Sequence, residues 1–129
     1  MTDTSPQFIN NPTIQGKEDK YLNIIVDLDK VIQSWRQSLF SFEWFLPDGR
    51  MRKPDEMNEK ERIKYEYTLK KLKDNETLTM PILGIGVLDN IEIGSGRENI
   101  LTIYSQNIKT MPVHIPKSVE KEFSSFIAK

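Results

Sequence analysis

The sequence predicts a fold of the α/β (α+β) class, in which helices flank one small mixed sheet. Short β-branched or apolar runs alternate along the chain with stretches whose apolar residues recur at helical spacing. Turn residues, such as Pro-Asp-Gly at 47–49 and Asp-Asn at 89–90, separate these runs. With 129 residues, the chain has the length of one domain with one hydrophobic core.

Residues 1–16 are polar and rich in Asn and Pro, so they offer little apolar area to offset the entropy of ordering them. We therefore expect a disordered tail over 1–16 and a single domain over 17–129. Neither a signal-peptide pattern nor an apolar run long enough to cross a bilayer occurs in the sequence. This predicts a cytoplasmic protein with no membrane partner.

The residue pattern in the first half of the domain predicts one strand and two helices. Residues 21–26 are β-branched and predict a strand, after which Asp27 or Asp29 can cap a helix. An apolar stripe extends that helix to Phe42, and it should end before the Pro-Asp-Gly turn. Asn58 then opens a charged second helix that ends near 74–75.

The second half predicts strands at 79–87, 91–93 and 110–115. A helix should follow the second of these strands and stop at Asn107, and a terminal amphipathic helix should follow Pro116. Its apolar residues have i, i+4, i+7 and i+8 spacing: Val119, Phe123, Phe126 and Ile127.

The loop at Gly94, Ser95, Gly96 and Arg97 joins a strand to a helix and is the candidate binding site. A helix N-terminus presents unpaired N–H groups and a partial positive charge, and glycines let a phosphate approach them. Ser95 can add a hydroxyl donor, and Arg97 can present a planar fork of donors. Glycines before a helix also serve tight turning or packing alone, and the sequence leaves both explanations open.

Three segments around this loop carry a family resemblance: Met-Pro-Ile-Leu-Gly-Ile-Gly at 80–86, Ile-Glu-Ile-Gly-Ser-Gly-Arg at 91–97 and Ile-Lys-Thr-Met-Pro-Val-His-Ile at 108–115. In this order they resemble the core of the ParB/sulfiredoxin superfamily, over about residues 65–115. The resemblance implies a ParB/sulfiredoxin-like fold that binds a nucleotide at the loop. It places Gly94 and Arg97 on the glycine and arginine of the family motif.

The resemblance implies a free-standing small member of the superfamily, such as a nucleotide hydrolase, a nucleotide-using kinase or a nuclease of a plasmid or phage. Sulfiredoxins have Cys and His where this chain has Ser95 and Gly96, which argues against sulfinic-acid reductase chemistry. Partition-type members have Glu-Arg there and carry a further DNA-binding region. A nucleoside triphosphate with Mg²⁺ is the expected ligand.

Carboxylates near the loop could hold that Mg²⁺ or act as a base, and Glu92 is the first candidate for the catalytic role. The others each have a simpler explanation as caps or surface charges: Asp27, Asp29, Glu43, Asp89 and Glu98. The chain has no Cys and one His, His114, so the sequence predicts no cysteine- or histidine-rich metal site.

An aromatic cluster supports the alternative, a non-catalytic module that binds protein or DNA on the same scaffold. Trp35 and Phe42 fit the apolar stripe of the first helix, whereas Trp44 and Phe45 lie off it and are the predicted partner-binding residues. Such rings can also stack on single-stranded bases. Lys and Arg number 18 against 19 Asp and Glu, so no net positive charge attracts nucleic acid.

Overall fold

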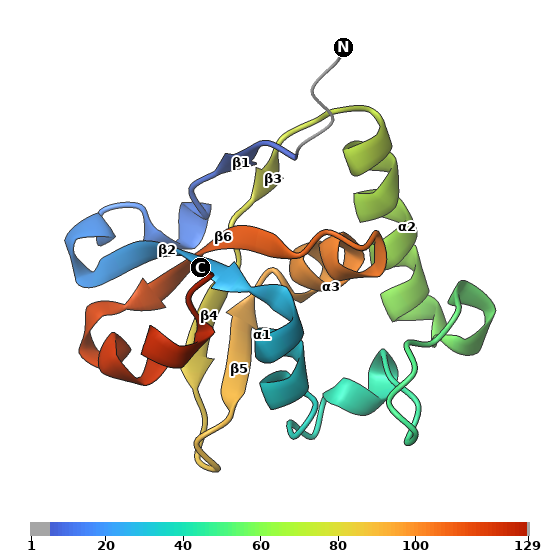
Figure 1. Ribbon diagram of the computed structural model, residues 1–129. Coiled ribbons are helices and arrows are strands. Elements are labelled where there is room, and N and C mark those ends of the chain that lie inside the picture. Colours follow the sequence, from blue (N-terminus) through green and yellow to red (C-terminus); the bar gives the residue numbers. More distant parts are fainter. Residues whose placement is uncertain (1–5, 129) are drawn as a thin grey trace.

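A four-stranded mixed sheet lies at the centre of the protein in the computed structural model, which describes residues 6–128 (Figure 1). Its strands are β2 (Tyr21–Asp27), β6 (Thr110–Pro116), β4 (Ile82–Ile85) and β5 (Ile91–Ser95), in that spatial order. β6 pairs antiparallel with β2 and parallel with β4, and β4 forms an antiparallel hairpin with β5. The predicted fold class, a small mixed sheet with flanking helices, is confirmed.

Three α-helices occur among the described residues. α1 (Leu28–Trp35) packs on β5, and α2 (Glu59–Lys73) packs on α3 (Arg97–Ser105) (Figure 1). The Asn58 side chain accepts a hydrogen bond from the Glu61 N–H, so the predicted cap of α2 is confirmed. None of the helices in residues 6–128 is long and apolar enough to cross a bilayer.

The core lies between the sheet and the helices. The buried face of α1 has the spacing that the apolar stripe predicted, since Leu28, Val31, Ile32 and Trp35 are each at most 1% exposed. Central-strand residues Val113 and Ile115 are fully buried, as is Phe123 from the C-terminal segment. This packing holds the C-terminal end of β5 in place, where the candidate loop leads into α3.

The predicted disordered tail is wrong for residues 6–16, while residues 1–5 lie outside the described part. β1 (Phe8–Ile9) pairs in parallel with β3 (Leu78–Thr79), and Asn11 and Ile14 are buried. The Asn11 side chain donates to the Met80 carbonyl at 3.0 Å. Specific hydrogen bonds, which an apolar-area argument does not count, therefore hold this segment on the domain.

His114 links the N-terminal segment to the sheet. Its imidazole is fully buried; Nε2 accepts a hydrogen bond from the Asn11 N–H at 3.0 Å, and Nδ1 lies 2.6 Å from Asn23 Oδ1. With Nε2 accepting, Nδ1 is the protonated nitrogen and donates to Asn23. Burial lowers the pKa of His114 below its usual value of 6.5. The imidazole is thus neutral and structural.

We expect the protein to lose stability as the pH falls below 6.5. The unfolded chain takes up the His114 proton there while the folded chain does not, so the free energy of unfolding decreases by up to about 1.4 kcal/mol per pH unit. Urea unfolding between pH 8 and 5 measures the slope. This is the chain's one histidine, so a flat profile from pH 6.5 to 5 would contradict the buried neutral imidazole.

Three predicted elements differ from the structure. α1 ends at Trp35 and does not reach Phe42, because the chain tightens into i→i−3 turns there and the Ser41 hydroxyl, which shares its proton between the carbonyls of Arg36 and Ser38, closes the last of them. The predicted strand at 79–87 breaks at Pro81, which separates β3 from β4. The terminal helix is a pair of 3₁₀ helices, Lys117–Val119 and Lys121–Phe126, after which the chain returns to bridge β2.

Thr102 of α3 is fully buried, and its hydroxyl oxygen has no hydrogen-bond partner among residues 6–128. We expect Thr102→Val to raise the free energy of unfolding by about 1 kcal/mol, because valine keeps the shape and removes the desolvated hydroxyl. Chemical denaturation measures the difference. Thr102→Ala is the control and should lower stability because it leaves a cavity; a destabilised valine variant would contradict the unpartnered hydroxyl.

Candidate functional site

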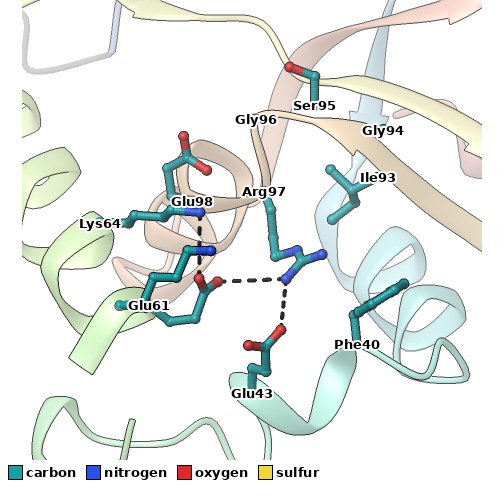
Figure 2. A pocket seen from close by; sticks show the side chains of 11 residues that line it. Phe40, Glu43, Glu61, Lys64, Ile93, Gly94, Ser95, Gly96, Arg97 and Glu98 are labelled. Atoms are coloured by element: carbon teal, nitrogen blue, oxygen red, sulfur yellow. Dashed lines mark hydrogen bonds and ion pairs between the residues drawn. The ribbon is translucent and has the colours of Figure 1, made fainter. Parts of the chain in front are cut away.

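A pocket of about 340 Å³ opens where β5 ends and α3 begins (Figure 2). Its lining comes from three parts of the chain: residues 93–98, one face of α2 (Lys60, Glu61 and Lys64), and the turn after α1 (Phe40 and Glu43). The predicted loop Gly94, Ser95, Gly96 and Arg97 therefore lines a concave surface. Sequence reasoning missed the contribution of α2, although Lys60 and Lys64 have the i, i+4 spacing of one helix face.

Gly94 is the extra residue of a β-bulge. Leu83 pairs with Ile93 and Ile82 pairs with Ser95, so β5 contains one residue more than β4 over this step. A Cβ at Gly94 would lie 3.6 Å from the Ile82 carbonyl oxygen, the nearest atom outside its two chain neighbours. The backbone therefore does not require glycine at this position.

Gly96, in contrast, is required by the fold. It precedes α3 with φ of 82°, in the left-handed region, and a Cβ here would lie 2.9 Å from Pro81 Cα. The alternative explanation of the glycines, tight turning and packing, thus accounts for Gly96. It does not account for Gly94.

The N-terminus of α3 has no side-chain cap. The N–H groups of Asn99 and Ile100 both donate to the Gly96 carbonyl, whereas those of Arg97 and Glu98 have no partner within residues 6–128. Unpaired N–H groups at a helix start carry partial positive charge and attract anions. Both residues line the pocket.

Arg97 is held by carboxylates from two other elements. Its Nη1 donates to Glu43 Oε1 at 2.9 Å and lies 3.6 Å from Glu61 Oε1. Figure 2 shows the side chain extending from the loop toward these two groups, beside Phe40. The guanidinium carbon lies 5.2 Å from the Phe40 ring centroid and 5.8 Å from that of Trp35. One arm of the predicted phosphate fork is therefore already occupied.

Glu61 is the buried centre of this network, with a side chain only 5% exposed. Its Oε1 accepts from Trp44 Nε1 at 3.0 Å, and Lys64 Nζ lies 3.5 Å from its Oε2. Glu43 also accepts a hydrogen bond from the Asn58 side chain at 3.1 Å. Ion pairs and hydrogen bonds thus join α2, α3 and the turn after α1.

The pocket's charges are balanced rather than positive. Its basic lining residues are Lys60, Lys64 and Arg97, and its acidic ones are Glu43, Glu61 and Glu98. Of the three cations, Lys60 alone has no carboxylate within 4.0 Å among residues 6–128. The residues that line the pocket thus include two with unpaired backbone N–H groups and one lysine without a carboxylate partner.

Ser95 lines the pocket but its hydroxyl is engaged elsewhere, and Glu92 lies outside the pocket. The Ser95 side chain points away from Arg97 and Glu43 (Figure 2), and its hydroxyl accepts from Asn11 Nδ2 at 3.1 Å. Glu92 does not line the pocket, because the alternation of β5 places it on the face opposite Ile93. Its carboxylate instead lies 3.3 Å from the Asn90 amide at the base of the β4–β5 turn.

The other candidate carboxylates are dispersed. Asp27 caps α1 by accepting from the Lys30 N–H, and Asp89 occupies the β4–β5 turn with φ of 60°. Glu43 and Glu98 line the pocket, as described above. Within residues 6–128, no group of three or more His, Cys, Asp or Glu side chains is placed to hold a metal ion.

The predicted exposure of Trp44 and Phe45 is wrong. They are 1% and 5% exposed and belong to the core, where Phe45 packs edge-on against Trp35 and Trp44 against Tyr65. Because the helix ends at Trp35, the stripe that placed Phe42 inside does not continue. Phe42 is 63% exposed and Phe40 is 54% exposed, so the aromatic surface exists but consists of these two residues.

No family model, curated protein or solved structure matches the chain in the comparisons with known proteins. The ParB/sulfiredoxin resemblance therefore stays a prediction from the sequence.

Proposed function

We propose that the chain binds the phosphate of a nucleotide at the start of α3. The observation that carries this proposal is the pair of unpartnered N–H groups of Arg97 and Glu98, two residues that line a pocket of about 340 Å³. Pockets that bind small molecules commonly have 300 Å³ or more. Lys60, from α2, supplies a positive charge to the same pocket.

The pocket also offers a surface for a base. Phe40 lines it and is 54% exposed, so one face of its ring is available for stacking while Arg97 lies over the ring at 5.2 Å. A ring beside an anion site favours a nucleotide over inorganic phosphate. The acidic lining residues disfavour a highly charged ligand alone, so Mg²⁺ enters this proposal together with the nucleoside triphosphate.

A matched pair of variants at Gly94 tests the site. A Cβ fits there, so Gly94→Asn and Gly94→Asp should both fold, but only the aspartate adds a negative charge beside the α3 N-terminus. We expect ATP with Mg²⁺ to raise the Tm of the wild type and of Gly94→Asn by several degrees, because a ligand at 100 times its Kd contributes about 2.7 kcal/mol. Gly94→Asp should lose the shift.

Two results would overturn the proposal. One is the absence of a Tm shift with any of the common nucleoside triphosphates in the wild type. The other is an equal shift in Gly94→Asp and Gly94→Asn, which would place any nucleotide elsewhere. Phosphate release by the wild type, measured in the same samples, decides whether binding is followed by hydrolysis.

A further inference from the structure

We infer that the pocket at α3 is one end of a longer path, and that this path binds single-stranded nucleic acid. The inference rests on the proposed function, because it makes the proposed phosphate site the binding site for one nucleotide of a chain. It stands on three observations: the adjacency of three hollows, two exposed aromatic rings, and two arginines without acidic partners among residues 6–128.

Three hollows follow one another across the turn after α1. The pocket at α3 shares Glu43 with a second hollow of about 190 Å³, which includes Asn58. That hollow shares Phe42 and Arg52 with a third, also of about 190 Å³, which reaches Arg36. The three hollows are therefore neighbours on the surface, and a ligand longer than one nucleotide can reach from the α3 pocket into the other two.

Phe40 and Phe42 supply two stacking surfaces along this path. Phe40 belongs to the α3 pocket, and Phe42 belongs to both of the other hollows. They are 54% and 63% exposed, and two residues of chain span at most about 7 Å, so their rings can take neighbouring bases. Rings of this kind bind unpaired bases of any sequence, because every base has a π face.

Arg36 and Arg52 supply the charge for the phosphates. Neither has a carboxylate within 4.0 Å in the part of the chain that the structure describes. Arg52 Nε donates to the Phe42 carbonyl, and the Arg36 guanidinium lies over the Phe45 ring at 5.7 Å. Both arginines thus line the third hollow together with Phe42, and no carboxylate within residues 6–128 pairs with either charge.

The acidic residues of the path are largely neutralised. Glu56 pairs with Arg50 at 3.0 Å, and Glu43 pairs with Arg97 at 2.9 Å. Exposed rings together with cations that have no carboxylate partner fit a chain of bases and phosphates. An apolar protein partner or a lipid surface would leave Arg36 and Arg52 facing apolar groups.

Fluorescence anisotropy with labelled 12-nucleotide dT and rU strands tests the inference. We expect both to bind, and we expect Phe42→Ala to weaken binding about tenfold. Tyr67→Ala is the matched control, because Tyr67 is 66% exposed and lines none of the three hollows. Arg36→Gln should reduce the salt slope of the affinity by about 0.7, the value of one phosphate contact, while Arg62→Gln should not.

The outcomes separate this inference from the proposed function. Absence of strand binding, or equal binding by Phe42→Ala and Tyr67→Ala, overturns the path even if ATP still shifts the Tm. Equal affinity for a 12-base-pair duplex also overturns it, because paired bases cannot stack on Phe40 and Phe42. If strands bind in a Phe42-dependent way but ATP does not shift the Tm, the path is supported. The proposed phosphate site at α3 is then overturned.

Discussion

Arg97→Ala is expected to lower the free energy of unfolding by about 3 kcal/mol. The substitution leaves the Glu61 carboxylate, whose side chain is 5% exposed, with Lys64 as its one charged partner among residues 6–128, and it leaves Glu43 without its guanidinium partner; removing one member of a buried charge network is costly. It also removes the contact with Trp35 at 5.8 Å. Urea unfolding followed by circular dichroism measures this loss of stability. Because the variant is destabilised, Arg97→Ala is not a clean test of ligand binding.

A second substitution isolates the charge effect. In the Arg97→Ala background, Glu61→Gln removes the buried negative charge that Arg97 no longer balances, while an amide oxygen remains for Trp44 Nε1. The double variant should regain part of the lost stability, and this non-additivity reports the coupling between the two residues. A double variant less stable than Arg97→Ala would show that Glu61 does not depend on Arg97.

Gly96→Ala should cost about 3 kcal/mol, the second large effect. Alanine has to adopt φ of 82°, and its Cβ would lie 2.9 Å from Pro81 Cα, a backbone atom that cannot move aside alone. The backbone between β3 and β4 must shift, and with it the start of α3. Thermal or urea denaturation measures the change.

Gly94→Ala is the matched control for this prediction. Its backbone is not left-handed, and its Cβ would meet the Ile82 carbonyl oxygen at an ordinary 3.6 Å. We expect a change below about 1 kcal/mol. Equal destabilisation by the two substitutions would mean that the positive φ of Gly96 and its contact with Pro81 carry no special cost.

Local signals in the sequence were enough to predict most of the elements. The strand at β2, the cap at Asn58 and the turn at Asp89 each depend on residues close together in the chain, and the structure has them all. The end of α1 was mispredicted because apolar spacing continues to Phe42, while the serine hydroxyl that closes the turn gives no periodic signal.

The candidate site was predicted only in the part that is local in sequence. The strand, glycine loop and helix at 91–105 could be read directly from the sequence. That Glu43 and Glu61 hold Arg97, or that Asn11 occupies the Ser95 hydroxyl, depends on contacts between residues 36 to 84 positions apart. Tertiary packing decides such contacts, and no local pattern specifies them.

The strand order has a consequence for how the chain acquires its fold. β6 is the last of the strands in sequence, yet it lies between β2 and β4, so the sheet has no centre until residues 110–116 are present. Before that point only the β4–β5 hairpin can pair within this sheet, and an isolated hairpin is marginally stable in water. During synthesis β2 therefore stays unpaired until β6, nearly ninety residues later in the chain, has been made. Assembly of the sheet is thus a late and cooperative event.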